Sequence, residues 1–189
     1  MQNKKKVLRK VLYALLVVIV LSLGYLFLHE PNYNGLIKKQ DEILVFAHRG
    51  FGNLAPDNSL VAAKLAMQNN IDGVDVDGQF SADNELVVFH DLSVDRLTSG
   101  TGKVSSKTIN ELRKLDLATK YGKGFENAYV ATFDDFVREI TPNGILMVEL
   151  KVPGSKDTGI EKRAAEIIEK YDAYENVYLS SFNPLVLYR

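Results

Sequence analysis

Charged residues two positions apart follow apolar segments at two places in the chain. Asp75 and Asp77 alternate with valines, and Glu149 and Lys151 stand at the end of an apolar run. Residues two apart in a strand point to the same face of a sheet, so each pair shares a face. Carboxylates on one buried face repel each other unless a cation or a proton lies between them. Asp75, Asp77 and Glu149 therefore predict an all-oxygen site for one divalent cation, Mg²⁺ or Ca²⁺.

Two histidines add acid–base chemistry to these carboxylates. His48 and His90 each follow a strand-like apolar run, and Arg49 and Asp91 come directly after them. An imidazole has an ordinary pKa near ~6.5, which suits a general acid or a general base. Arg49 and Lys151 would neutralise the oxygens of an anionic substrate, whereas Asp91 is expected only to cap a turn. Each pattern alone is common on protein surfaces, but their coincidence at separate strand ends favours phosphoryl transfer over acyl or glycosyl transfer.

The elements that must position these residues alternate between strand and helix. We expect strands at 43–47, 73–77, 86–89, 145–150 and 177–181, with a turn around 82–84 between the second and the third. Helices are expected at 60–68, 108–115 and 159–171, after Thr132 and from Pro184. This alternation predicts an α/β fold with a parallel sheet and crossover helices. No glycine-rich nucleotide loop follows a strand. The polar residues stand instead at the carboxyl ends of several strands, where (β/α) barrel enzymes hold their catalytic groups.

Composition narrows the classes of function. The 189 residues are 46% hydrophobic and 25% charged, as in an ordinary folded domain. The formal net charge of −1 conceals a basic cluster in the first ten residues, so the rest of the chain is acidic and disfavours nucleic-acid binding. The chain has no cysteine, which excludes disulfides, thiolate catalysis and zinc–thiolate sites.

The N-terminal region predicts attachment to a membrane. Residues 1–10 are basic, and the uncharged residues 11–28 would span roughly 27 Å as a helix, close to the hydrocarbon core of a bilayer. We expect a single-pass anchor at 11–28, a cytoplasmic N-terminus, a spacer at 29–41 and an extracytoplasmic domain at 42–189. A cleaved signal peptide is the alternative, but the apolar run exceeds the usual ~7–15 residues and no small-x-small site follows it.

Several segments, in order, resemble the glycerophosphodiester phosphodiesterase family. They read AHRGFGNLAPDNS, IDGVDVDGQFSADNELVVFHD, DRLTSGTG and ILMVELK, with SSFNPLVL near the end. The resemblance covers residues 43–189. It implies a (β/α)₈ TIM barrel that uses one divalent cation to hydrolyse glycerophosphodiesters to glycerol 3-phosphate and an alcohol.

The resemblance also assigns roles to individual positions. It implies catalytic histidines at His48 and His90, phosphate-binding residues at Arg49 and Lys151, and metal ligands at Asp75, Asp77 and Glu149. Asp75 and Asp57 stand where the family usually has Glu, so each carboxylate is drawn back by ~1.5 Å, roughly one C–C bond. We expect altered metal affinity, with Ca²⁺ slightly favoured over Mg²⁺ because its coordination is more flexible.

The length of the chain raises a question about completeness. A full barrel takes ~250 residues, so residues 42–189 suffice for about five β/α units. We expect a partial barrel and a fragment of a longer protein.

Substrate and function both have open alternatives. The substrate could be a soluble headgroup diester, a lysolipid or a glycerophosphate polymer, and membrane anchoring would favour the last two. Other functions are a catalytically silent half-barrel that binds partners and a phosphoinositide-cleaving phospholipase C. Product analysis separates the enzymes, because the latter would release inositol phosphate.

Overall fold

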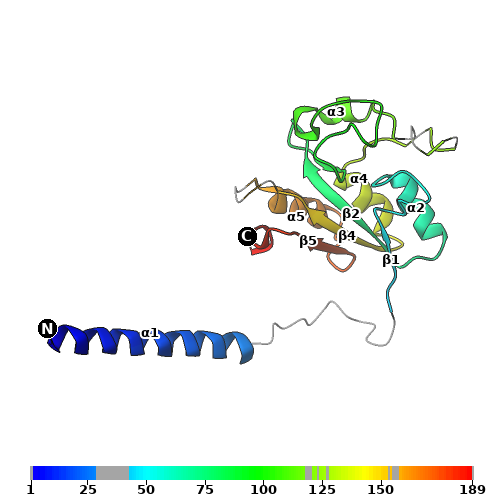
Figure 1. Cartoon of the computed structure of the whole chain (residues 1–189). Coiled ribbons are helices and arrows are strands. Elements are labelled where there is room, and N and C mark those ends of the chain that lie inside the picture. The colour runs from blue at the N-terminus through cyan, green and yellow to red at the C-terminus, as the bar shows by residue number, and fades with distance from the viewer. Residues whose placement is uncertain are drawn as a thin grey trace. The chain divides into compact units, whose positions relative to one another are not determined.

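In the computed structural model one long helix precedes an alternation of strands and helices (Figure 1). The structure describes residues 2–28, 43–117, 121–122, 124–126, 128–152, 154 and 158–188. The chain divides into two units, Met1–Asp41 and Glu42–Arg189, each of which is treated by itself. The elements are α1 (Gln2–Leu28), β1 (Phe46–His48), α2 (Leu60–Gln68), β2 (Gly73–Phe80), β3 (Leu86–Val88), the 3₁₀ helix η1 (Val104–Ser106), α3 (Ile109–Leu112), α4 (Phe133–Ile140), β4 (Ile145–Leu150), α5 (Ile160–Lys170), β5 (Val177–Ser180) and α6 (Pro184–Tyr188).

Helix α1 corrects the expectation for the N-terminal region. It runs without a break from Gln2 to Leu28, so the basic residues and the apolar run at 11–28 lie in one helix. Within the described part of the chain, no helix has the length and apolar character needed to cross a membrane. The prediction of a single-pass membrane protein with a transmembrane anchor, a cytoplasmic N-terminus and an extracytoplasmic domain is therefore wrong. The expected spacer at 29–41 lies outside the described residues.

The sheet has a parallel spine in the order β1-β2-β4-β5. Strand β3 pairs antiparallel with β2, with Gly78 opposite Val88, across the turn that the sequence predicts around residues 82–84. Only a tight turn joins the two strands. Its ends are held by the Ser81 N–H, which donates to Glu85 O at 3.0 Å, and Asn84 within it has a φ of 59°. A connection this short allows a hairpin but no parallel crossover.

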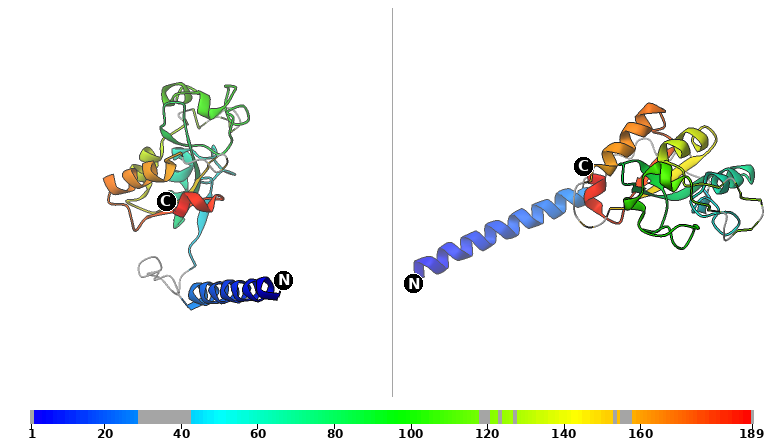
Figure 2. Two further views of the ribbon diagram at one scale, coloured as in Figure 1. Left: turned by 90° about the vertical axis from the view of Figure 1, so that its left-hand side faces the viewer. Right: turned by 90° about the horizontal axis from the view of Figure 1, so that it is seen from above.

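Side-chain capping sets where several helices begin. Ser59 Oγ accepts from the Ala62 N–H at the start of α2, and Thr108 and Thr132 form capping boxes at the starts of α3 and α4. Helix α3 ends at Leu112, three residues earlier than expected. Helices α2, α4 and α5 follow one another along the sheet (Figures 1 and 2).

The main core lies between the sheet and these helices, and it decides which face of each strand is free. Val74, Val76, Leu146 and Val148 are buried in this core. The residues that alternate with them along each strand, including Asp75 and Glu149, point to the opposite face of the sheet. Burial of the valines and leucines against the helices thus directs the acidic residues away from the core. A second buried cluster, which includes Val87, Phe89 and Leu112, is formed by described residues between 87 and 130.

Candidate active site

Strand β2 is the centre of the site, because it pairs with β1, β3 and β4. In register, His48 of β1 lies opposite Asp75, and Glu149 of β4 lies opposite Asp77. Parallel neighbours therefore bring one histidine, at the carboxyl end of β1, and one further carboxylate, near the carboxyl end of β4, to the two aspartates in the middle of β2.

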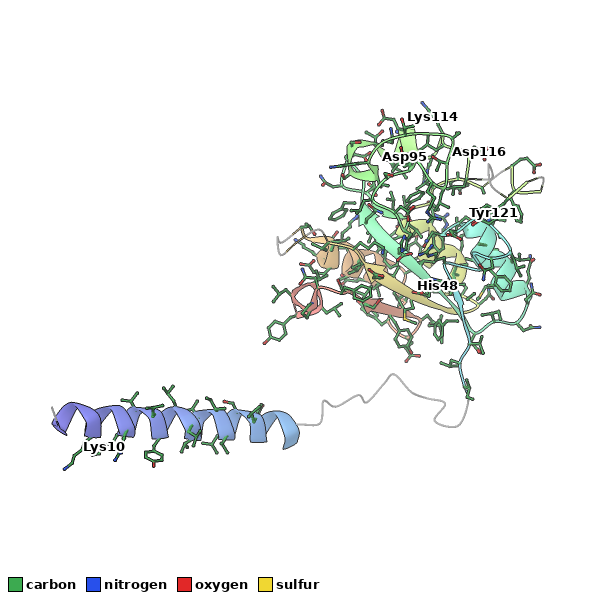
Figure 3. The ribbon with its side chains drawn as sticks, viewed as in Figure 1. Lys10, His48, Asp95, Lys114, Asp116 and Tyr121 are labelled. Atoms are coloured by element: carbon green, nitrogen blue, oxygen red, sulfur yellow. The ribbon has the colours of Figure 1, made fainter. Side chains whose placement is uncertain are left out.

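The first histidine forms a pair with the aspartate across from it. His48 Nδ1 lies 2.9 Å from Asp75 Oδ2, and the His48 side chain is 74% exposed at the end of β1 (Figure 3). A carboxylate oxygen accepts hydrogen bonds, so Nδ1 is placed to donate to it in this pair. Nε2 is then left to exchange a proton with a bound molecule.

The second histidine is held by a more extensive set of contacts. Buried Gln79 of β2 donates from Nε2 to the carbonyl oxygens of Phe89 and Asp91, both at 2.8 Å, and so ties the segment around His90 to β2. His90 Nδ1 lies 2.7 Å from Asp91 Oδ1. Arg96 Nε donates to Asp91 Oδ2 at 2.6 Å.

The environment of Asp91 keeps this carboxyl ionised. The hydrogen bond from Arg96 is the main cause that lowers the pKa of Asp91 to about 2; partial burial opposes this effect, and the contact with His90 adds to it. Asp91 is thus a partner of the imidazole, where the sequence predicted only a turn cap. Neither Gln79 nor Arg96 was among the predicted site residues, although Arg96 stands in the DRLTSGTG segment.

The carboxylates of β2 and β4 share one ammonium group. Lys151 Nζ lies 3.0 Å from Asp77 Oδ1 and 3.3 Å from Glu149 Oε1. Asp77 is 6% exposed, and buried Asn58 both donates to its Oδ2 at 3.0 Å and accepts from its N–H at 2.9 Å. Lys151, predicted to bind phosphate, therefore contacts two of the predicted metal ligands.

These carboxylates fit a hard cation by the chemistry of their donors. Asp77 and Glu149 present oxygen atoms to one positive charge, the Lys151 ammonium, which marks a position where a cation is favoured. Asp75 contacts His48 instead. Among the described residues, no group of three acidic, histidine or cysteine side chains is arranged to hold a metal ion.

Arg49 lies in the tight turn after β1, with a φ of 52°. Its Nη1 donates to Asp57 Oδ2 at 3.1 Å, and Tyr121 donates its hydroxyl to Asp57 Oδ1 at 2.9 Å. A Cβ at Gly52 would overlap Asp57, so the glycine makes room for this carboxylate. Arg49 Nε is buried and has no hydrogen-bond partner among the described residues. A buried donor of this kind calls for an acceptor, which ordered water or an oxygen of a bound ligand can supply.

An open cavity of about 650 Å³ adjoins these groups. Four of its lining residues are polar members of the site, namely His90, Asp91, Glu149 and Lys151. Leu92, Val152 and Phe182 add apolar surface, whereas His48, Arg49 and Asp75 do not line this cavity. The described structure therefore joins His90 to the carboxylate–lysine cluster in one cavity and leaves His48 on the β1 side.

Comparisons with known proteins point to one family. A glycerophosphodiester phosphodiesterase from Caldanaerobacter subterraneus subsp. tengcongensis is 38% identical over 141 residues, which are 74% of this chain and 58% of that protein. A phosphodiesterase structure from Oleispira antarctica, in complex with the product sn-glycerol-3-phosphate, is 30% identical, with a TM-score of 0.69 over 77% of this chain and 60% of that one. A glycerophosphodiester phosphodiesterase structure from Agrobacterium tumefaciens is 28% identical, with the same TM-score of 0.69, and it too is matched over 77% of this chain and 60% of that one.

These matches fix the family and the fold at a coarse level. The chain spans about half the length of the curated relatives it matches. Their likeness supports the TIM-barrel-like α/β fold with its parallel sheet, and the partial barrel stays a prediction. The model of the glycerophosphoryl diester phosphodiesterase family matches residues 48–189, which is most of the chain. The chain therefore belongs to the glycerophosphoryl diester phosphodiesterase family.

Proposed function

We propose that the chain contributes the catalytic groups for hydrolysis of glycerophosphodiesters to glycerol 3-phosphate and an alcohol. The observation that carries this proposal is the pair of imidazole–carboxylate contacts, His48 with Asp75 and His90 with Asp91, in which His48 ends β1 and His90 lies two residues after β3. The reaction class comes from the family, and a related enzyme from Oleispira antarctica has been seen with sn-glycerol-3-phosphate as its product.

The two imidazoles would move the protons of the reaction. Each holds Nδ1 against a carboxylate, so each has Nε2 available for proton exchange. One removes a proton from the nucleophile, which is either water or the neighbouring glycerol hydroxyl. The other gives a proton to the departing alcohol oxygen, and a positioned group of this kind contributes about 10²–10⁴ in rate.

Arg49 and Lys151 would hold the negative charge of the phosphodiester. The buried Nε of Arg49 has no hydrogen-bond acceptor among the described residues, and a phosphate oxygen of the substrate would accept from it. The Lys151 ammonium lines the cavity that also contains His90. Charge-assisted hydrogen bonds from both residues would orient the substrate for attack at phosphorus.

The proposed metal ligands remain Asp75, Asp77 and Glu149. A divalent cation at these carboxylates would supply Lewis-acid stabilisation of charge on the phosphoryl oxygens. We propose Ca²⁺ over Mg²⁺, because the aspartate at position 75 shortens one ligand and Ca²⁺ accepts less regular geometry. The support for a cation here is the way in which Asp77 and Glu149 share the Lys151 ammonium.

The structure gives no reason to favour lysolipid or glycerophosphate-polymer substrates over soluble diesters. Lysolipid and glycerophosphate-polymer substrates were preferred on the strength of membrane anchoring, and no membrane-spanning helix is found among the described residues. The proposed substrate is therefore the glycerophosphodiester class as a whole. Membership of the glycerophosphoryl diester phosphodiesterase family removes the support for a phosphoinositide-cleaving phospholipase C.

The test measures product and metal binding separately. The purified chain is incubated with glycerophosphocholine, and glycerol 3-phosphate is measured with Ca²⁺, with Mg²⁺ and with a chelator. We expect release that the chelator abolishes, and a loss of at least about 10² in rate for His48→Ala. Titration calorimetry with each metal alone should show binding that Asp77→Asn and Glu149→Gln both weaken. Glycerol 3-phosphate release that is unchanged in His48→Ala would contradict the proposed role.

Full activity with Mg²⁺ and none with Ca²⁺ would refute the metal preference and leave the reaction class intact. No release of glycerol 3-phosphate from any variant, with metal binding retained, would favour a catalytically silent half-barrel.

A further inference from the structure

Arg96 contacts two carboxylates that belong to different parts of the site. Its Nε and Nη2 donate to Asp91 at 2.6 and 3.0 Å, one nitrogen to each carboxylate oxygen. Its Nη1 lies 3.9 Å from Asp57 Oδ2 on the other side. The guanidinium is planar, so a two-point contact fixes the plane of the Asp91 carboxylate as well as its position.

A continuous chain of polar contacts results. Arg49 Nη1 donates to the same oxygen, Asp57 Oδ2, at 3.1 Å. The order is therefore His90, Asp91, Arg96, Asp57 and Arg49, which runs from a proposed acid–base group to a proposed phosphate-binding group. Two guanidinium groups share one carboxylate oxygen in the middle of this chain.

We propose that Arg96 is a positioning residue that orients His90 through Asp91 and supports Arg49 through Asp57. This inference rests on the proposed function and adds a residue that acts without contact to the reacting atoms. Asp91 directly follows His90 in the sequence, and an aspartate on a loop could turn its carboxylate in several directions. The bidentate contact with Arg96 leaves Oδ1 facing His90 Nδ1 at 2.7 Å.

The charge on Asp91 agrees with this geometry. Its pKa is lowered to about 2 chiefly by the hydrogen bond from Arg96. At neutral pH the carboxylate is therefore ionised, and it accepts hydrogen bonds but donates none. An acceptor at Oδ1 requires the proton of the imidazole to sit on Nδ1. Arg96 therefore acts on the tautomer of His90 as well as on its orientation.

Arg113 offers a matched control in a structural setting. It is 43% exposed, against 46% for Arg96, and it also donates to a well-buried aspartate, Asp135, at 2.9 Å. Replacement of either arginine by glutamine removes one partly exposed guanidinium from an aspartate. Only Arg96 has an imidazole beyond that aspartate.

The first measurement is the ring-nitrogen NMR signals of the histidines at neutral pH in the full chain. In the wild-type protein we expect His90 to carry its proton on Nδ1, and in Arg96→Gln we expect a mixture of tautomers. Arg113→Gln should keep the wild-type signals. Unchanged His90 signals in Arg96→Gln would overturn the proposal, provided that Arg96→Gln is folded by circular dichroism.

The second measurement is hydrolysis of glycerophosphocholine. Arg96→Gln should lower kcat about 10–100-fold, the usual loss when a supporting partner is removed from an active-site ligand, and Arg96→Lys should recover part of it. Asp91→Asn should cause a similar loss, and the double variant should be no worse than either single one. Additive losses, or an equal loss in Arg113→Gln, would contradict a shared role.

The two measurements separate this proposal from the proposed function. If the wild-type chain releases no glycerol 3-phosphate, the proposed hydrolysis fails, and the ring-nitrogen signals still decide whether Arg96 sets the tautomer of His90. If the wild-type chain is active and the signals do not change in Arg96→Gln, the positioning role fails alone.

Discussion

Two aspartates in this molecule are held by arginines and have lowered pKa values, yet their surroundings differ. Asp91 is bound by Arg96 beside the candidate active site. Asp135, in the first turn of α4, is bound by Arg113 and Arg138, both at 2.9 Å. By residue type and contact distance, the two clusters are alike.

The difference lies in where each set of contacts ends. Asp135 also accepts from the N–H and the hydroxyl of Thr132, at 3.1 and 2.8 Å, so its oxygens are used in capping α4. Burial acts to raise the pKa of Asp135, but the bonds from Thr132 and the two arginines outweigh it and lower the pKa. Contacts around Asp91 end instead on His90, which faces a cavity of about 650 Å³. We infer that the closed set of contacts around Asp135 stabilises the fold, whereas the set around Asp91 holds the imidazole for the proposed proton transfer.

Replacement of His90 tests this distinction with the largest expected effect. His90→Ala removes the group on which the Asp91 contacts end, and we expect kcat to fall at least about 10²-fold because proton transfer is lost. The unfolding free energy should hardly change, since the side chain is one-third exposed. Steady-state kinetics and urea unfolding measure the two quantities. A large loss of stability with wild-type kcat would mean that the contacts around Asp91 and His90 stabilise the fold and do not take part in catalysis.

Replacement of Asp135 should have the opposite profile. Asp135→Ala removes a buried carboxylate from a helix cap and from two arginines, so we expect the free energy of unfolding to fall by about 2 kcal/mol. The kcat of the folded protein should stay at the wild-type value. Asp134→Ala is the matched control on the neighbouring position. Its carboxylate accepts from Lys170 and Tyr171 but takes no part in the capping box, so this variant should destabilise the fold less than Asp135→Ala. Equal destabilisation by the two variants would contradict the role given to Asp135.

The pH dependence of stability should be similar for Asp91 and Asp135, although their replacement affects kcat differently. Both have folded-state pKa values below the unfolded value, so each stabilises the fold fully above about pH 4 and loses that contribution as pH falls through its folded pKa. For Asp91 the window runs from about pH 4 down to about 2. We expect Asp91→Asn and Asp135→Asn both to flatten the acid limb of stability in urea unfolding. If a variant loses stability in acid as steeply as the wild type does, the ionised form of the replaced aspartate does not stabilise the fold.

The sequence could predict which side chains lie together where the alternation of residues along a strand determines the face to which each one points. Alternation in β2 and β4 directs Asp75, Asp77 and Glu149 away from the helices, and parallel pairing then places Glu149 opposite Asp77. Periodicity carries no information on contacts between loops. The Asp57 contact with Tyr121 joins residues 64 positions apart, and no local pattern encodes it.

The hairpin of β2 and β3 and the N-terminal helix differ in how well the sequence predicted them. Turn residues around 82–84 predicted a short connection, and antiparallel pairing of β3 follows from that shortness. The apolar run at 11–28 predicted a transmembrane anchor, whereas no membrane-spanning helix is found among the described residues.

A surface ion pair gives the smallest expected effect and completes the comparison. Lys64 Nζ lies 2.6 Å from Glu139 Oε2, the same distance as between Arg96 Nε and Asp91 Oδ2. The Lys64 and Glu139 side chains are 51% and 31% exposed, so water replaces the contact at little cost when it is broken. We expect Lys64→Ala to shift the midpoint of thermal unfolding by no more than about 2 °C and to leave kcat unchanged. A loss of activity comparable with that of Arg96→Gln would mean that short contact distance, and not the group at the end of the contacts, determines what an ion pair does in this protein.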